Sequence, residues 1–193
     1  MSKSVLISIN PKWCELIASG KKTIEVRKTK PKLETPFKCY IYCTTTGDLC
    51  YKSNNDGKIR ITKNTLSMVK ALSITHQTFL NGKVIGEFVC DEICEYYPID
   101  IKDPINKPYG EEIEKESCLS TKQVNDYGFR TLGYGMLFGW HITDLVIYDE
   151  PKELSCFCKP VECHRGLQKE GCVGCWDCEI KRPPQSWCYV QEV

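Results

Sequence analysis

The distribution of cysteine constrains this 193-residue chain more than any other feature of its sequence. The chain has 14 cysteines, and six of them lie within residues 156–178. Besides its cysteines, that stretch has only five scattered apolar residues. These are too few for a hydrophobic core of its own, and we expect a cross-link to hold it together. Seven further cysteines are scattered between Cys14 and Cys118, and we expect most of these to be small core side chains.

The kind of cross-link depends on the redox environment of the chain. The N-terminal residues contain a single apolar run, at 5–9, which is too short for the core of a signal peptide. Elsewhere, no apolar run approaches the roughly 18 residues that a membrane span needs. We therefore expect a cytoplasmic protein with no membrane partner, in which thiols stay reduced and metal ligation is favoured over disulfides.

Overlapping C-x-x-C pairs at residues 172–178 are typical of a zinc site. Zinc takes four soft ligands in a tetrahedron, and a C-x-x-C turn presents two thiolates to one ion. The spacing predicts a structural zinc bound by Cys163, Cys172, Cys175 and Cys178, with Cys158 and His164 as alternates. A catalytic zinc is not favoured, because the H-x-E and P-C-x-x-C pattern of the zinc deaminases is absent. Reduced free thiols or a redox pair are the remaining alternatives.

The rest of the sequence predicts a mixed, mainly β fold of the α+β class. Alternation and β-branched residues predict strands at 5–9, 23–28, 38–44, 83–93, 139–150 and 186–191. Caps and apolar spacing predict short helices after Asn10-Pro11, around 64–72, and after Ser120, where Gln123 completes a capping box. Residues 94–119 are acidic and contain three prolines, so we expect a long loop there. No repeat or βαβ rhythm is present, and a small mixed or closed β-barrel with flanking helices fits best.

Charge is balanced over the whole chain but uneven along it. Lys and Arg number 26 and Asp and Glu number 25, which excludes a uniformly basic binder. Residues 20–38 nevertheless hold seven basic and two acidic residues, whereas residues 87–116 hold ten acidic and three basic ones. Both stretches can be ordinary solvated surface. Alternatively, the basic stretch attracts a phosphate-bearing ligand.

Residues 20–27 read G-x-K-x-x-E-x-R, with Gly20, Lys22, Glu25 and Arg27 at the specified positions. Together with ISINPKWCELIASG before it and GKVIGEFVCDEI and YGMLFGWHITDLVIY after it, this pattern resembles the ASCH domain of the PUA-like superfamily. The resemblance covers roughly residues 3–150 and the strand at 186–191. The closing RPPQSWCYV is similar to ASCH proteins carried by phages and prophages of low-GC bacteria.

The resemblance implies a PUA-like mixed β-barrel at 1–154 and a closing barrel strand at 182–193. The cysteine spacing predicts a zinc-knuckle-like insertion between them, at 155–181. The resemblance also implies a cleft beside the first helix that the motif residues line. Related PUA domains bind RNA, so the resemblance implies an RNA or nucleotide partner for this chain. A protein partner, recognised through the Cys-rich segment and the acidic stretch, is a further possibility.

The motif residues have the chemistry that a nucleotide needs. Glu25 and Arg27 are two apart on a strand and point the same way, so arginine can contact phosphate or a base edge while glutamate accepts from an exocyclic amine. Lys22 adds a positive charge, and Ser8 can donate a hydrogen bond into the cleft. Trp140 follows Gly135 and Gly139, which leave room for a stacked base. The structural alternative is an ordinary ion pair beside a packed aromatic core.

An enzymatic alternative follows from the same resemblance. Some small ASCH members are amidohydrolases that remove the acetyl group from N4-acetylcytidine, using the motif lysine to activate a threonine and a later glutamate to assist. Carried over, the lysine is Lys22, the threonine position falls on Glu25, and the helix after Ser120 offers only Asp126. In that case Lys22 and Glu25 would be the catalytic residues.

Overall fold

The computed structural model describes residues 3–98, 107–130, 133–160 and 178–192. Their contacts divide the chain into two compact units. Unit 1 comprises Met1–Glu15, Lys38–Phe88 and Val146–Val193, and unit 2 comprises Leu16–Phe37 and Val89–Leu145. The first of the four positions at which the chain passes from one unit to the other lies within helix α1 (Pro11–Ala18). None of the helices in the described part of the chain is long and apolar enough to cross a membrane.

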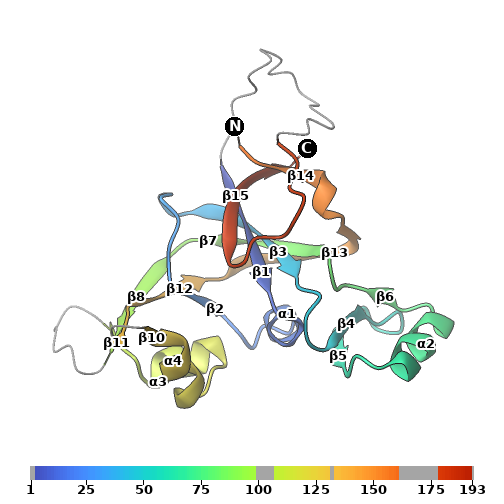
Figure 1. Ribbon diagram of the computed structural model, residues 1–193, viewed down its shortest axis with the longest axis horizontal. Coiled ribbons are helices and arrows are strands. Elements are labelled where there is room, and N and C mark those ends of the chain that lie inside the picture. The colour runs from blue at the N-terminus through green and yellow to red at the C-terminus, as the bar shows by residue number, and fades with distance from the viewer. Residues whose placement is uncertain (1–2, 99–106, 131–132, 161–177, 193) are drawn as a thin grey trace, which may run out of the picture. The chain divides into compact units, whose positions relative to one another are not determined.

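Unit 1 is built on a six-stranded sheet in the order β13-β7-β3-β1-β15-β14 (Figure 1). The central strand β1 runs parallel to β3 and antiparallel to β15. The hydrophobic core of unit 1 contains the buried side chains of Leu6, Tyr40, Tyr42, Val84, Phe157, Ile180 and Val190. The strands are β1 (Ser4–Ile9), β3 (Phe37–Cys43), β7 (Val84–Cys90), β13 (Thr143–Lys152), β14 (Phe157–Cys158) and β15 (Trp187–Glu192), and a short helix η1 (Leu154–Cys156) precedes β14.

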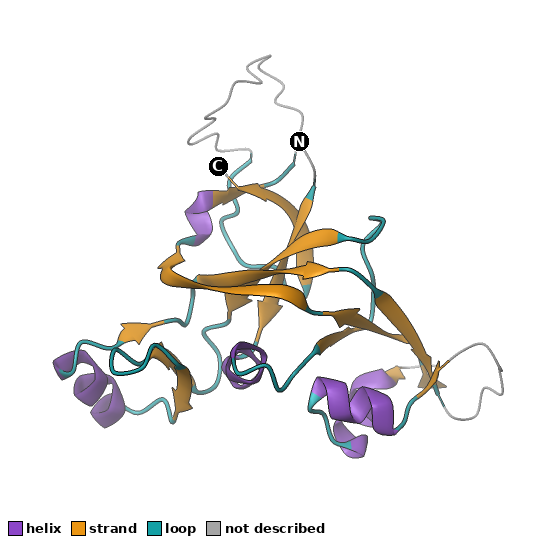
Figure 2. Ribbon diagram, turned by 180° about the vertical axis from the view of Figure 1, so that it is seen from behind, coloured by secondary structure: helices purple, strands orange, loops and turns teal. Residues whose placement is uncertain are grey.

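A second, three-stranded sheet in unit 1 has the order β5-β4-β6 and is accompanied by helix α2 (Figure 2). The elements are β4 (Leu49–Lys52), β5 (Ile59–Thr62), α2 (Leu66–Ile74) and β6 (Thr78–Phe79). The hydroxyl of Thr65 accepts a hydrogen bond from the backbone of Met68 and so caps α2. The predicted helix around 64–72 is confirmed, but the three short strands around it were not predicted.

Unit 2 is built on a four-stranded sheet in the order β2-β12-β8-β9. One face of this sheet packs against two helices through a core of Ile24, Val26, Tyr96, Tyr109, Ile113, Val124 and Leu137. The capping box of Ser120 and Gln123 is present at the start of the second helix, as predicted. The elements are β2 (Ile24–Arg27), β8 (Ile93–Tyr97), β9 (Lys107–Pro108), α3 (Glu111–Ser117), α4 (Thr121–Gly128), β12 (Leu137–His141) and the hairpin of β10 (Phe129–Arg130) and β11 (Gly133–Tyr134).

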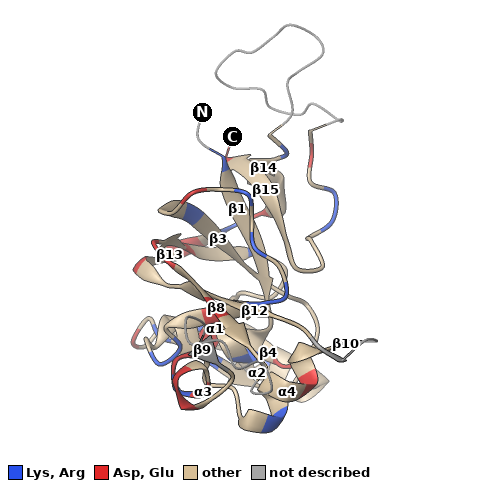
Figure 3. Ribbon diagram, turned by 90° about the vertical axis from the view of Figure 1, so that its left-hand side faces the viewer, with Lys and Arg blue, Asp and Glu red and all other residues tan. Residues whose placement is uncertain are grey.

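The structure confirms a mixed, mainly β fold with short helices, and its sheets are open in the described residues. Three predicted elements are wrong in detail. The strand predicted at 83–93 is two strands, β7 and β8, separated at Asp91 and Glu92, and the strand predicted at 139–150 is β12 and β13, separated at Ile142. The loop predicted at 94–119 contains α3, whose first turn holds Glu111, Glu112 and Glu114, in the acidic segment shown red in Figure 3. Acidic residues favour the first turn of a helix because its free N–H groups carry partial positive charge.

Candidate functional site

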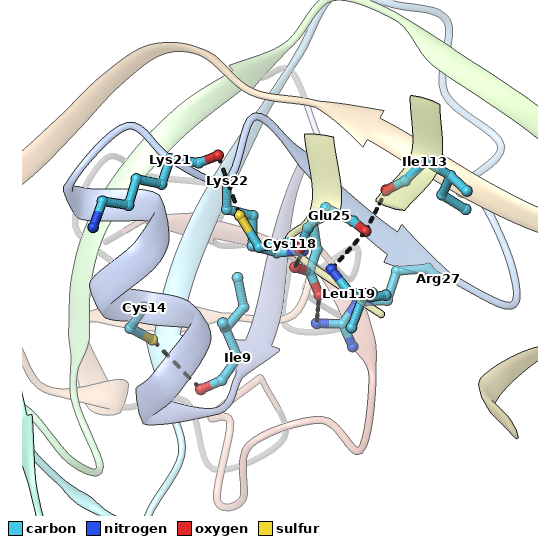
Figure 4. Close-up of polar contacts among 10 residues, drawn as sticks. Ile9, Cys14, Lys21, Lys22, Glu25, Arg27, Ile113, Cys118 and Leu119 are labelled. Atoms are coloured by element: carbon cyan, nitrogen blue, oxygen red, sulfur yellow. Dashed lines mark hydrogen bonds and ion pairs between the residues drawn. The ribbon is translucent and has the colours of Figure 1, made fainter. Parts of the chain in front are cut away.

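Lys22, Glu25 and Arg27 come together in unit 2 as a buried charged cluster, which we call the motif cluster (Figure 4). Their exposed fractions are 3%, 6% and 7%. Lys22 lies in the turn before β2, and Glu25 and Arg27 lie on β2 itself. Charged side chains are rarely this deeply buried unless they are paired, and here the pairing is within the cluster.

The carboxylate of Glu25 lies between the two cations. Its Oε1 is 2.9 Å from Nη2 of Arg27, and its Oε2 is 3.3 Å from Nζ of Lys22. The contact with Arg27 follows from the two-residue spacing on a strand, which puts both side chains on one face. The contact between Lys22 and Glu25 joins residues three positions apart in the sequence, and it depends on the turn that precedes the strand.

The motif cluster is attached to the C-terminal end of α3. Nζ of Lys22 donates to the carbonyl oxygen of Ser117 at 2.9 Å, and the backbone of Thr23 donates to Glu116 at 2.8 Å. The thiol of Cys118 donates to the carbonyl oxygen of Lys21 at 3.3 Å (Figure 4). An ammonium group at a helix C-terminus is favourable, because the last carbonyl groups carry partial negative charge. Sequence reasoning missed this attachment because it predicted a loop where α3 lies.

The register of the sheet places two aromatic residues on the same face as the motif cluster. Trp140 lies opposite Glu25, and Phe138 lies opposite Arg27; directly opposite residues of antiparallel strands point to the same side. The ring of Trp140 has 0% exposure and contacts the ring of Phe37 edge-on, with centroids 5.8 Å apart. Trp140 therefore has no exposed surface on which a base can stack, contrary to the role predicted for it.

Ser8 belongs to unit 1, and its polar groups are used within that unit. Its hydroxyl donates to the carbonyl oxygen of Pro184 at 2.6 Å, and its backbone N–H donates to Ser186 at 2.9 Å. These bonds hold the segment before β15 against β1. The hydroxyl proton is thus used in a structural contact and is not available to a ligand in this conformation.

The zinc prediction is covered by the structure only in part. Cys163, His164, Cys172 and Cys175 lie outside the described residues. In the part that is described, no group of three or more possible ligands is assembled. Cys158 and Cys178 bracket the segment 161–177, and the backbone brings them together, because Cys158 bridges to Glu179 and Lys159 donates to the carbonyl of Cys178 at 2.8 Å. Cys158 and Cys178 are both buried at this point, with exposed fractions of 6% and 8%.

The scattered cysteines are mostly buried, as predicted. Cys14, Cys39, Cys43, Cys50 and Cys90 are at most 1% exposed. A hydrogen bond with the thiol of Cys14 raises the pKa of Cys43, and burial raises the pKa of Cys90 to about 12. Thiols with raised pKa values form little thiolate at neutral pH, so these residues act as small core side chains.

Comparisons with known proteins give a distant likeness only. No protein-family model matches the chain, and no curated protein sequence matches it. Among solved structures, an ASCH protein from Zymomonas mobilis matches with a TM-score of 0.48 and 17% identity, over 97% of this chain and 87% of that one. A mutant of the same protein matches with a TM-score of 0.48 and 16% identity, over 98% of this chain and 91% of that one. At these values the likeness assigns no activity, ligand or site residue to this chain.

Proposed function

We propose that this chain is an ASCH-type module that binds RNA or a nucleotide, and that the motif cluster is its binding site. The observation that carries the proposal is the burial of two cations around one carboxylate, at 3.3 Å and 2.9 Å. Removing charges from water costs several kcal/mol for each ion, and apolar residues of similar size often give an equally stable interior. Stability alone is therefore a weak reason for this cluster, whereas buried ionisable groups are concentrated at functional sites.

The three residues have different parts in this proposal. The side chains of Glu25 and Arg27 each keep 8% exposure, whereas that of Lys22 keeps 2%. Arg27 and Glu25 would make the direct contacts, the guanidinium with phosphate or a base edge and the carboxylate with an exocyclic amine. Lys22 would support these two residues by holding the carboxylate of Glu25 in place and by attaching the turn before β2 to α3.

The proposal is tested by measuring the binding of mixed-sequence single-stranded RNA and of single nucleotides to the full chain. Replacing Arg27 with Lys keeps the positive charge but removes the planar donor group, and should weaken binding about tenfold or more. The matched control is Arg60→Lys, which alters an exposed pair with Asp56 at 2.8 and 2.7 Å and should leave binding unchanged. Absence of binding to every RNA and nucleotide at high protein concentration would refute the proposal.

A second candidate function is amide hydrolysis of N4-acetylcytidine-type nucleosides. The observation in its favour is a buried lysine next to a carboxylate, with Lys22 as base and Glu25 as its partner. The contacts of Lys22 count against it, because a group that donates to Ser117 and pairs with Glu25 is arranged as an ammonium, which has no lone pair to accept a proton. Release of cytidine from N4-acetylcytidine, lost in Lys22→Arg, would establish the hydrolase and displace the binding proposal.

We also propose a structural zinc bound by Cys163, Cys172, Cys175 and Cys178. The support is chemical: two overlapping C-x-x-C pairs lie in a stretch whose composition offers no core. In the described residues, the backbone brings Cys178, one of these four, close to the alternate Cys158 at the base of the segment. The zinc would supply folding energy for the segment and take no part in ligand binding.

A further inference from the structure

The face of the unit 2 sheet that carries the motif cluster continues beyond it to an exposed end. Arg27 lies opposite Phe138, and Phe138 lies opposite Glu95 on the next strand. All three side chains therefore point to one side of the sheet. Exposure rises along this row, from 8% for the side chain of Arg27 to 33% for that of Glu95. The part of the face that a large ligand reaches most easily is thus the end at Glu95.

At that end, the carboxylate of Glu95 accepts hydrogen bonds from the ammonium group of Lys30 and from the hydroxyl of Tyr97. Nζ of Lys30 donates to Oε1 at 2.5 Å, and the hydroxyl of Tyr97 donates to Oε2 at 3.0 Å. Lys30 also lies over the ring of Phe138, 5.4 Å from its centroid. The hydrogen bond from Lys30 is the main cause that lowers the pKa of Glu95, so the carboxylate is charged near neutral pH. We call Lys30, Glu95 and Tyr97 the outer cluster.

The outer cluster borders a basic segment that begins at the end of β2. Arg27, Lys28, Lys30 and Lys32 lie within six residues that contain no Asp or Glu. The side chain of Lys30 is 48% exposed, and Tyr97 is half-buried. A half-buried tyrosine next to an ammonium group suits single-stranded RNA, in which bases and phosphates alternate along the strand.

We propose that the outer cluster is the part of the RNA-binding surface on which a base stacks, in place of the buried Trp140. The ring of Tyr97 carries the base, Lys30 contacts an adjacent phosphate, and Glu95 is a positioning residue that orients both. This inference rests on the proposed function, because it extends the face of the motif cluster. It identifies single-stranded RNA as the ligand. It also adds contacts with the RNA that the motif cluster does not make.

The test compares two ligands of equal length, an oligoadenylate of about ten nucleotides and the same backbone without bases. Tyr97→Leu removes the ring and should weaken oligoadenylate binding by about 5- to 100-fold, while binding of the abasic strand stays as in wild type. Tyr97→Phe keeps the ring and should bind oligoadenylate nearly as wild type does. Lys30→Ala should weaken the binding of both ligands. It should also lower the salt dependence of the binding constant by the amount expected for about one phosphate contact.

Two control variants match these changes elsewhere. Tyr51→Leu alters another half-buried tyrosine, in β4, and Lys122→Ala breaks another exposed lysine–carboxylate pair, the one with Asp126. Both should bind the two ligands as wild type does. If Tyr97→Leu does not fold, the Lys30→Ala and Tyr97→Phe measurements still decide the inference.

The outcomes separate this inference from the proposal on which it rests. If Arg27→Lys weakens RNA binding while Tyr97→Leu and Lys30→Ala do not, the outer cluster is not part of the site and only this inference is overturned. Equal losses for oligoadenylate and the abasic strand in Tyr97→Leu would overturn the stacking role. If wild type binds no RNA, both proposals are overturned.

Discussion

Lys22 donates a hydrogen bond to the carbonyl oxygen of Ser117, 95 positions later in the chain, at 2.9 Å. The same ammonium group is 3.3 Å from the carboxylate of Glu25. Lys22 therefore serves as a cap for α3 and as a member of the motif cluster. A change at this residue alters the stability of unit 2 as well as its chemistry.

Lys22→Met should lower the free energy of unfolding by about 3 kcal/mol, because it deletes one partner of a buried ion pair and leaves the Ser117 carbonyl without its donor. Urea denaturation measures the loss. Lys122→Met, at the exposed pair with Asp126, is the control and should cost less than about 0.5 kcal/mol. Equal small losses in the two variants would show that the motif cluster contributes nothing to stability.

Much of the fold follows from local sequence signals. The helix after Ser120 was predictable because its capping box lies within four residues, and β2 because polar and apolar residues alternate along it. The attachment of Lys22 to Ser117 was not predictable, since it joins residues 95 positions apart and depends on the placement of α3. Local signals describe neither the partner nor the distance in such a contact.

The prediction for Trp140 failed for a definable reason. Its neighbour Gly139 was interpreted as leaving room for a ligand, but a Cβ atom there would lie 2.8 Å from Cε2 of Tyr96. The space beside Gly139 is thus filled by Tyr96, a core residue of the adjacent strand. A glycine next to an aromatic residue in a strand does not by itself distinguish a ligand site from close packing.

Gly86→Ala should destabilise unit 1 by about 1–3 kcal/mol or more. In the structure, a Cβ atom there would lie 2.3 Å from the carbonyl oxygen of Val146, and a backbone atom cannot move aside as a flexible side chain can. Val146→Ala, which trims a 50% exposed side chain at the same contact, should change stability by less than about 0.5 kcal/mol. Thermal unfolding of both variants measures the difference, and a neutral Gly86→Ala would contradict this packing.

Stability should fall in acid partly through Glu87. Burial acts to raise the pKa of Glu87, but hydrogen bonds from Lys38 at 2.7 Å and Tyr148 at 2.6 Å outweigh it and lower the pKa. A carboxyl group with a lowered pKa stabilises the fold above its unfolded pKa of about 4, and this contribution is lost as pH falls through the lower folded value.

Glu87→Gln removes that dependence while keeping an acceptor for Tyr148. The variant should be less stable than wild type at neutral pH, and the difference should shrink as the solution is acidified below about pH 4. Urea denaturation at a series of pH values measures it. A stability difference that stays constant across the series would show that the charge on Glu87 does not contribute.

Metal content distinguishes the two cysteines that bracket the Cys-rich segment. If zinc is bound by Cys163, Cys172, Cys175 and Cys178, protein purified without chelator should contain about one zinc ion per chain. Cys178→Ser should lower that content sharply, because serine is a poor zinc ligand. Cys158→Ser should retain the ion, because Cys158 is not one of these four ligands. Cys118→Ser, at a thiol bonded to Lys21, is the control. Mass spectrometric metal analysis of the three variants decides the matter: loss of zinc in Cys158→Ser with retention in Cys178→Ser would reverse the assignment, and a metal-free wild type would exclude the zinc.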